Sequence, residues 1–517
     1  MASSSLAEGM FVIQKGGKLV INGTEEYSVI IDGGANYQTP INYNNGFLDK
    51  ASLLVYASDT HRSMKKPAIR NFGTLTMEYV TVRNVYNSCG SDATSAQKAG
   101  AVLHAGTSGT VKTTLTNCVV ERCKSPLGSG LFMCSESVGT VTLTDCEFRD
   151  CVSTETKGAT STGTIRSFGD TETSLNMYRV KVHHCYANLS GGGVYINAAG
   201  ASTTMATISG CEIYNNYSEV HGGGFNGGGN FQFTDTYGQN LIHNNHAGEV
   251  GGGIHFYAYS GGKAPSSAVN VKEIVDSSVE VYGNDAPNGA GIAFTSNNEI
   301  SLPKNSTYSL SIEGADIHDN VATNNGGGVY YDNGYTGSKY SFSAIIKTGS
   351  NIHKNEAGGD GGGLYMNKAP ITIEGGTIQY NTSQNGAGLY VQNGDVQIGL
   401  AEVSSNTAEG DGGGFYVNGG NVTISDGLIS GNSSVSGGGV YVNDGNFTFT
   451  NGNVDGNTAT LNGGGAYVSG GDVTFKGNFS GNTAANGGGL YLGPGASMEF
   501  QGGLIINNEA TMPDGAT

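Results

Sequence analysis

The chain has 517 residues, of which 86 are glycine, more than twice the usual share. Charged residues make up 13% and hydrophobic residues 37%, with only 9 prolines, so the composition excludes a highly charged disordered chain, a coiled coil and collagen. The 25 basic and 43 acidic residues give a net charge of −18. A nucleic-acid partner is therefore not expected, because its phosphates would be repelled.

The two ends of the sequence carry no recognisable targeting signal. Residues 1–8 lack the apolar segment of a signal peptide, residues 512–517 lack a sorting tail, and no stretch of about 18 apolar residues occurs. We therefore expect a fragment of a larger exported protein that does not insert into a membrane by itself.

A repeat of about 25 residues organises the chain. The period 412–436 contains three short alternating segments, at 415–417, 422–424 and 428–430, separated by turn residues. Three strands in each period predict an all-β fold, a right-handed parallel β-helix (solenoid) of about 17 coils with roughly 25–38 residues each.

The first part of the chain keeps this period without the glycine signal. We expect residues 1–70 to form starting coils and a cap, and residues 71–215 to form coils that carry cysteine. Six cysteines fall into two columns, Cys118, Cys146 and Cys211 in one and Cys123, Cys151 and Cys185 in the other. Their spacing matches no zinc module, so we predict stacked buried thiols, with disulfides between neighbouring coils as the alternative. Cys89 and Cys134 fit neither column and are the best candidates for a loop disulfide.

Residues 216–360 are predicted to form coils with long loops, because their glycine triplets are 29 to 38 residues apart. Three of these triplets begin at residues 222, 251 and 289. In the strand that follows each of them, the outward-facing position is occupied by Asn226, His255 and Ala293, respectively. Loops are expected to cover this face, so a pocket is predicted between residues 222 and 361. An enzyme acting on polysaccharides would need carboxylates, or Ca²⁺ with a basic residue, on neighbouring coils there.

Residues 361–517 are predicted to form the most regular coils. Their glycine triplets, or Gly-Ala-Gly, begin 24 to 26 residues apart, at Gly361, Gly386, Gly412, Gly437, Gly463 and Gly487. An apolar residue, two variable positions and an asparagine precede each triplet, which gives the column Asn355, Asn381, Asn406, Asn432, Asn457 and Asn482. Amides at one turn of every coil predict a buried asparagine ladder, and the glycines predict a tight corner.

A tyrosine follows most triplets at the outward position of a strand. Seven successive coils carry Tyr330, Tyr365, Tyr390, Tyr416, Tyr441, Tyr467 and Tyr491. These rings predict either a structural aromatic ladder or a recognition surface for sugar rings or a protein.

Other polar residues have simpler interpretations. Asp360 and Asp411 precede triplets without recurring in every coil, so turn chemistry explains them, with a Ca²⁺ ligand as the alternative and no other cofactor expected. His183, His184 and His221 have no acidic cluster beside them in the sequence and are predicted to be surface or satisfied core residues.

The segment Phe479-Ser-Gly-Asn482, followed by Gly487-Gly-Gly-Leu490, resembles the repeat of the chlamydial polymorphic membrane proteins, with its signatures F-x-x-N and G-G-A-I. Here Ile or Val usually replaces the phenylalanine. The resemblance implies a secreted or cell-surface adhesin-like protein.

We therefore expect a non-enzymatic bacterial adhesin-like β-helix whose partner is a glycan or a protein at a cell surface, bound through the seven tyrosines. The alternative is a carbohydrate-active enzyme, a polysaccharide lyase or glycoside hydrolase, with its site in the long coils 222–361.

Overall fold

The computed structural model describes residues 10–34, 43–44, 47–48, 64–89, 93–106, 111–134, 137–154, 162–167, 172–197, 206–229, 231–258, 268, 270–296, 303–368 and 370–512. Their regular elements are β-strands and the 3₁₀ helix η2 (Ser95–Lys98). No helix formed by these residues is long and apolar enough to cross a membrane. The chain divides into two compact units, Met1–Glu273 with Glu299–Thr307 and Ile274–Asn298 with Tyr308–Thr517.

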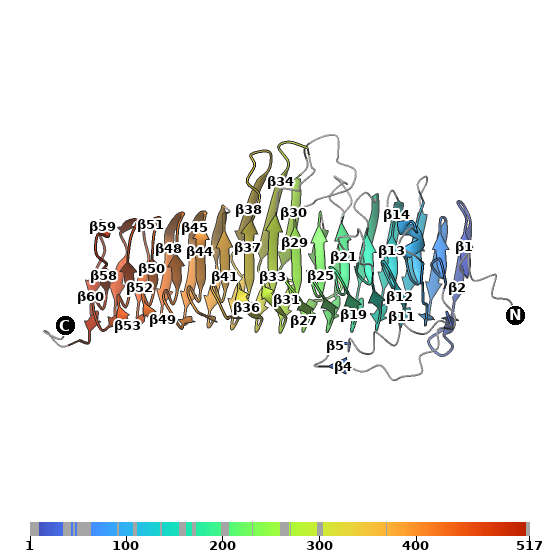
Figure 1. Cartoon of the computed structure of the whole chain (residues 1–517), viewed down its shortest axis with the longest axis horizontal. Helices are drawn as coiled ribbons and strands as arrows, with labels where there is room; N and C mark the ends of the chain where they lie inside the picture. The colour runs from blue at the N-terminus through green and yellow to red at the C-terminus, as the bar shows by residue number, and fades with distance from the viewer. Residues whose placement is uncertain are drawn as a thin grey trace. The chain divides into compact units, whose positions relative to one another are not determined.

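In the first unit, strands of successive coils pair in parallel into three sheets (Figure 1). The first sheet contains β1 (Phe11–Ile13), β6 (Ile69–Asn71), β9 (Val102–His104), β13 (Leu131–Met133), β17 (Ile165–Ser167), β21 (Val194–Asn197), β25 (Phe225–Gly228) and β29 (Ile254–Tyr257). The second sheet runs from β2 (Lys18–Asn22) and β3 (Val29–Asp32) to β26 (Phe231–Thr234) and β27 (Asn240–His243). The third sheet contains β12 (Lys124–Ser125), β16 (Val152–Ser153), β20 (Tyr186–Ala187), β24 (Tyr217–Ser218) and β28 (His246–Ala247).

The second unit repeats this arrangement. Its first sheet contains β33 (Ile292–Ser296), β37 (Val329–Asn333), β41 (Leu364–Asn367), β44 (Leu389–Asn393), β47 (Phe415–Val417), β50 (Val440–Val442), β54 (Ala466–Val468) and β58 (Leu490–Leu492). The second sheet includes β31 (Val279–Tyr282), β35 (Asp316–His318), β39 (Asn351–His353), β42 (Ile371–Gln379), β45 (Asp395–Ser404), β48 (Asn421–Ser430) and β52 (Asn453–Asp455). The third sheet runs from β32 (Asp285–Asn288) to β61 (Glu509–Ala510). The predicted parallel β-helix is therefore confirmed.

The strand boundaries differ from the prediction in one respect. The expected segments 422–424 and 428–430 belong to a single strand, β48, which pairs with β45 on both sides of Ser425. The third sheet is instead supplied by β49 (Ser433–Ser436), directly after the ladder asparagine. Strand pairing therefore continues through Asp426 and Gly427, where the sequence suggested a turn.

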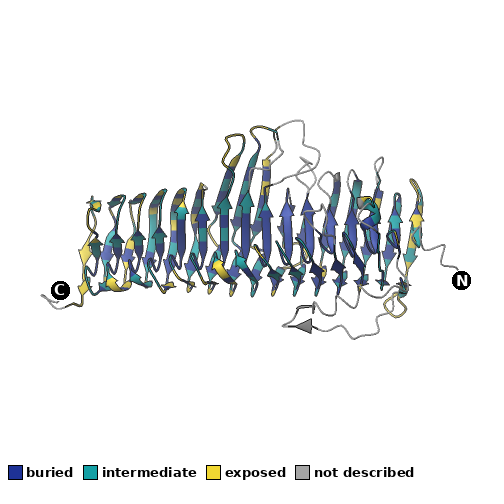
Figure 2. Cartoon of the chain, in the orientation of Figure 1, coloured by how far each residue is buried: buried dark blue, intermediate teal, exposed yellow. Residues whose placement is uncertain are grey.

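Alternate residues of the strands fill the interior of each unit. Along β50, Val440 and Val442 are buried and Tyr441 between them is half-buried, the pattern expected of a strand with one face in a core. Figure 2 shows buried residues along the strands of both units and exposed residues in the last coil, where Leu504, Ile505 and Ile506 are open to solvent.

The asparagine ladder is confirmed in the second unit. Asn432 donates its backbone N–H and its side-chain Nδ2–H to Asn457 Oδ1, both at 3.0 Å, and Nδ2 also donates to the Val403 carbonyl at 2.9 Å. The same contacts link successive asparagines from Asn284 to Asn508. Each ladder residue thus satisfies buried polar groups of the coils on both sides.

The glycine triplet forms the corner before the first sheet. Gly437 has a φ of +66°, a conformation that favours glycine. A Cβ atom on Gly438 would lie 2.5 Å from the Gly464 carbonyl oxygen and 2.6 Å from that of Thr458. The triplet therefore provides both the turn and the close approach of neighbouring coils, as predicted.

Candidate functional site

The seven predicted tyrosines form one continuous column on the first sheet of the second unit, which we call the tyrosine ladder. Strand register places each directly opposite the next. Ring centroids of successive members are 4.8 to 5.4 Å apart, and their planes differ by 5° to 17°. The rings therefore cover each other's faces, which leaves ring edges and hydroxyl groups for a ligand.

The hydroxyl groups of the ladder lie among oxygen acceptors. Tyr330 donates to Asp332 Oδ2 at 3.4 Å, and Tyr390 donates to Gln392 Oε1 at 3.2 Å. Burial, together with the charges of Asp332 and Asp360, raises the pKa of Tyr365 to about 12. The Tyr365 phenol consequently remains a protonated hydrogen-bond donor at neutral pH.

Asp360 and Asp411 belong to a polar row beside the tyrosine ladder. Asn385 lies between them, donating Nδ2–H to Asp360 Oδ1 at 2.9 Å and accepting the Asp411 N–H at 3.0 Å. Burial raises the pKa of both carboxyl groups. The described part of the chain contains no group of three or more His, Cys, Asp or Glu side chains that could hold a metal ion. These contacts match the turn role predicted for both residues.

Histidines and carboxylates form pairs across coils on the second sheet. In the first unit, Nε2 of His183 lies 2.8 Å from Glu147 Oε1, and Nε2 of His243 lies 3.3 Å from Glu212 Oε1. Tyr214 stacks between the two imidazole rings, with centroids at 4.6 and 5.1 Å. His183 is therefore isolated from acidic residues only along the sequence, because its partner lies in the preceding coil.

The second unit repeats this pairing with more carboxylates. His318 contacts Glu280 Oε1 through Nε2 at 3.1 Å and Asp319 Oδ2 through Nδ1 at 2.7 Å. His353 Nε2 lies 3.0 Å from Asp316 Oδ1, and its ring stacks on that of His318 with centroids 4.9 Å apart. Two imidazoles and three carboxylates thus gather on the outside of the long coils, which we call the histidine–carboxylate cluster.

This cluster predicts a pH-dependent contribution to stability. Burial opposes protonation of His318, but its hydrogen bonds to the carboxylates of Asp319 and Glu280 and the charge of Asp316 outweigh burial and raise the His318 pKa above its usual value. Its stabilising contribution is therefore complete below the unfolded-state pKa of about 6.5 and is lost as the pH rises through the folded-state pKa. We expect His318→Gln to cost about 1 kcal/mol near pH 5.5 and little near pH 9, measured by urea unfolding. An equal cost at both pH values would contradict this assignment, and Glu280→Gln should reduce the pH dependence.

The outward face of the first sheet is covered in the first unit, as predicted for Asn226 and His255. Their exposed fractions are 1% and 2%, and Asn226 Nδ2 lies 3.1 Å from His255 Nδ1. Tyr257 stacks on His255 and its hydroxyl meets that of Tyr195. Ala293, in the second unit, is likewise buried. The pocket expected in the long coils falls partly on residues 259–267 and 297–302, outside the described residues, so it stays a prediction.

His221 also has polar neighbours from adjacent coils. Its Nδ1 lies 3.5 Å from Ser190 Oγ, and its Nε2 lies 3.2 Å from Glu249 Oε2. A nucleophilic serine would require free backbone donors for an oxyanion. The N–H groups of Gly191 and Gly192 instead donate to carbonyl groups of the next coil at 2.8 and 3.1 Å. The arrangement is therefore a hydrogen-bonded corner.

All eight cysteines are described as thiols, and seven of them are buried. The predicted columns are confirmed by strand register. Cys118, Cys146 and Cys211 directly precede residues that the register aligns across β11 (Val119–Glu121), β15 (Glu147–Arg149), β19 (Lys181–His183) and β23 (Glu212–Tyr214), and Cys123, Cys151 and Cys185 lie two residues after the aligned Glu121, Arg149 and His183. The thiols donate to backbone carbonyl groups, as Cys146 does to Leu115 at 3.4 Å. The Cys185 N–H donates to Asn216 Oδ1 at 3.1 Å, and Asn216 Nδ2 donates to Asn245 Oδ1 at 3.0 Å, so asparagine continues the second column within the first unit.

The predicted Cys89–Cys134 disulfide is wrong for this structure. Cys134 packs in an apolar cluster with Leu103 and Phe132, whereas the Cys89 N–H donates to Asn87 Oδ1 at 3.0 Å. Cys89 and Cys134 therefore lie in different local environments and are not bonded to each other.

Comparison with known proteins supports the architecture. The chain is an all-β parallel β-helix, and residues 362–513 match the family model described as a right handed beta helix region. Neither the curated proteins nor the solved structures give a significant match to the chain.

Proposed function

We propose that the chain is a non-enzymatic, adhesin-like β-helix, secreted or displayed on a bacterial cell surface, that binds a glycan or a protein through the tyrosine ladder. The observation that carries the proposal is the unbroken column of stacked rings over seven coils, in which six rings are partly exposed and Tyr390 is 6% exposed. Phenol hydroxyls and ring edges recognise polar ligands at a low cost in rotamer entropy. The resemblance to the chlamydial repeat, with its F-x-x-N signature, supports an exported adhesin-like role.

The chemistry around the ladder favours a ligand rich in hydrogen-bonding groups. Asp332 and Gln392 accept from ladder hydroxyls, and Asn367 Nδ2 donates to Asp332 Oδ1 at 2.9 Å. The resulting surface alternates donors and acceptors at the spacing of the coils, about 4.8 Å. A glycan or an exposed protein backbone offers complementary groups.

Replacing Tyr390, Tyr416 and Tyr441 together with phenylalanine tests the proposal. Phenylalanine keeps the ring stack and removes the hydroxyl groups, so we expect the melting temperature to change little and binding to fall about tenfold or more. Binding is measured on a glycan array and to intact epithelial cells. The matched control replaces the exposed Tyr27, Tyr237 and Tyr380 with phenylalanine. Unchanged binding by the ladder variant, or no binding by the native protein, would contradict the proposal.

The histidine–carboxylate cluster favours one alternative, a carbohydrate-active enzyme. Glu280 and Asp316 lie opposite each other on the neighbouring strands β31 and β35, so carboxylates converge outside the long coils as such an enzyme requires. The test is the release of new chain ends from polysaccharides, by reducing-sugar and ultraviolet assays. Release that Glu280→Gln and Asp316→Asn abolish would favour the enzyme over the adhesin.

A further inference from the structure

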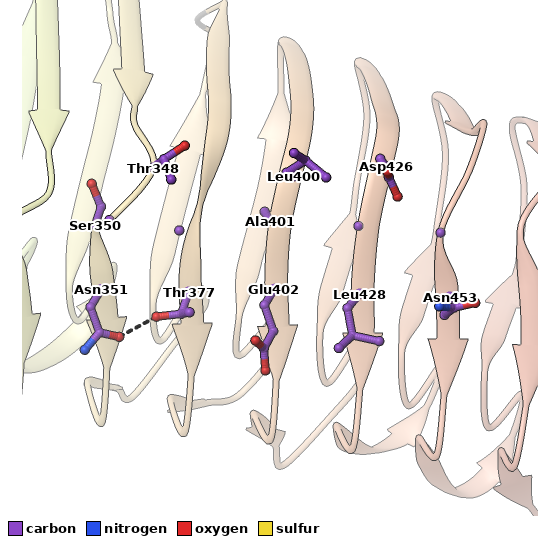
Figure 3. Close-up of a pocket in the computed structure, with 14 residues that line it drawn as sticks. Thr348, Ser350, Asn351, Thr377, Leu400, Ala401, Glu402, Asp426, Leu428 and Asn453 are labelled. Atoms are coloured by element: carbon purple, nitrogen blue, oxygen red, sulfur yellow. Dashed lines mark hydrogen bonds between the residues drawn. The ribbon is translucent and has the colours of Figure 1, made fainter.

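A surface groove of about 550 Å³ crosses the second sheet of the second unit. It extends over five successive coils, from the segment 348–351 through β42, β45 and β48 to Asn453 (Figure 3). Neighbouring coils are about 4.8 Å apart, so the groove is about 20 Å long. This face is separate from the first sheet that carries the tyrosine ladder.

Small residues of the second sheet form the floor of the groove. Strand register aligns Gly376 with Ala401 and Ala401 with Gly427. A Cβ atom on Gly376 would lie 2.5 Å from the Ser350 carbonyl oxygen, so this position excludes a larger side chain. Each of these residues precedes a ladder asparagine by five positions, which is a recurring signal in the sequence.

The walls of the groove combine aliphatic groups with hydrogen-bonding groups. Leu400, which is 71% exposed, and Asp426 lie on one side, while Glu402 and Leu428 lie on the other with Ala401 between them (Figure 3). Thr377 Oγ1 donates to Asn351 Oδ1 at 2.5 Å along the second wall. No lysine, arginine or histidine belongs to the described lining.

The lining restricts the class of ligand. Two carboxylates without a lining cation disfavour an anionic polymer, because like charges repel. Strand addition by a peptide is disfavoured because the coils already pair the backbone groups of β42, β45 and β48 with one another. The lining places carboxylate, amide and hydroxyl groups beside the exposed Leu400 and the partly exposed Leu428. Such a lining suits a ligand whose hydroxyl groups alternate with C–H surfaces.

We infer that this groove binds an extended, uncharged polysaccharide chain that lies across the coils. Sugar hydroxyls hydrogen-bond to Glu402, Asp426 and Thr377, and the C–H faces of the sugar rings pack on Leu400 and Leu428. This site is independent of the tyrosine ladder and extends the binding function to a second face.

Calorimetric titration of the full chain tests the inference. The probes are neutral hexasaccharides of β-1,4-linked glucose, mannose, xylose and N-acetylglucosamine, with hexagalacturonate and hexalysine as charged comparisons. We expect at least one neutral chain to bind and hexagalacturonate not to bind. The double variant Leu400→Ala/Asp426→Ala should weaken that binding about tenfold or more. The control variant Leu461→Ala/Asp472→Ala changes two exposed side chains outside the groove and should bind normally.

Other results would overturn the inference. The inference fails if no neutral hexasaccharide binds, or if the groove variant binds the sugar as tightly as the native protein does. It also fails if hexalysine binds as tightly as the best sugar, because the groove would then only attract cations. The phenylalanine variant of the tyrosine ladder should bind the neutral chain normally. If that variant loses sugar binding and the groove variant does not, the groove inference fails and the proposed function stands.

Discussion

Replacing Asn432 with leucine is expected to lower the free energy of unfolding by about 3 kcal/mol. The side chain is 1% exposed and is bonded on both sides, since it donates to Asn457 and Val403 and accepts two hydrogen bonds from Asn406. Leucine would leave these buried groups in the two neighbouring coils without their Asn432 partner. Urea unfolding followed by circular dichroism and tyrosine fluorescence measures the loss, which is convenient because the chain has no tryptophan.

The control for this substitution is Asn443→Leu. Asn443 is exposed and donates only one surface side-chain hydrogen bond, to Asn418 at 2.9 Å. Its replacement should change stability by about 0.5 kcal/mol or less. A similar loss in both variants would mean that the ladder contributes no more than a surface amide. Hydrogen exchange should become faster around residues 403–457 only in the Asn432 variant.

Replacing Gly438 with alanine should cost about 3 kcal/mol, because the new methyl group would strike backbone atoms of the next coil. Gly438 is not among the residues of positive φ, so the cost arises from contact between coils rather than from backbone conformation. The melting temperature and the urea midpoint should both fall.

Gly456→Ala separates the two effects. Gly456 has a φ of +62°, and a Cβ atom there would meet nothing within 4 Å. Alanine should therefore cost only the strain of a left-handed conformation, about 1 to 2 kcal/mol. If Gly456→Ala proved the more damaging change, the strain of a left-handed conformation would outweigh the close contact of neighbouring coils at Gly438.

Columns that keep one residue type were predictable from the sequence. Asn432, Gly437 and Tyr441 recur at fixed positions in neighbouring coils, so their stacking follows from the period. The backbone conformation of the residue before each ladder asparagine was harder to predict, because its residue type varies. This residue has a positive φ even where it is Lys354, Tyr380 or Ser405, because the ladder contacts fix the following residue and the chain must turn there.

The histidine–carboxylate cluster could not be predicted in the same way. Asp316 and His353 are 37 residues apart and meet diagonally across two coils, at a separation that varies with loop length. The groove was missed for another reason. Part of its floor lies where β48 continues through Gly427, a small residue that suggested the end of a strand.

The direction of the ladder hydrogen bonds has a mechanical consequence for the second unit. Bonds such as those from Asn432 to Asn457 connect one coil with the next, as do the backbone bonds of the sheets. A force along the stacking direction acts on the hydrogen bonds of one interface between coils at a time. We therefore expect the coils to detach one after another at low force. A force directed along the strands shears many bonds together and should meet much greater resistance. In single-molecule stretching, attachment points at the two ends of the stack should therefore give many small, evenly spaced extensions.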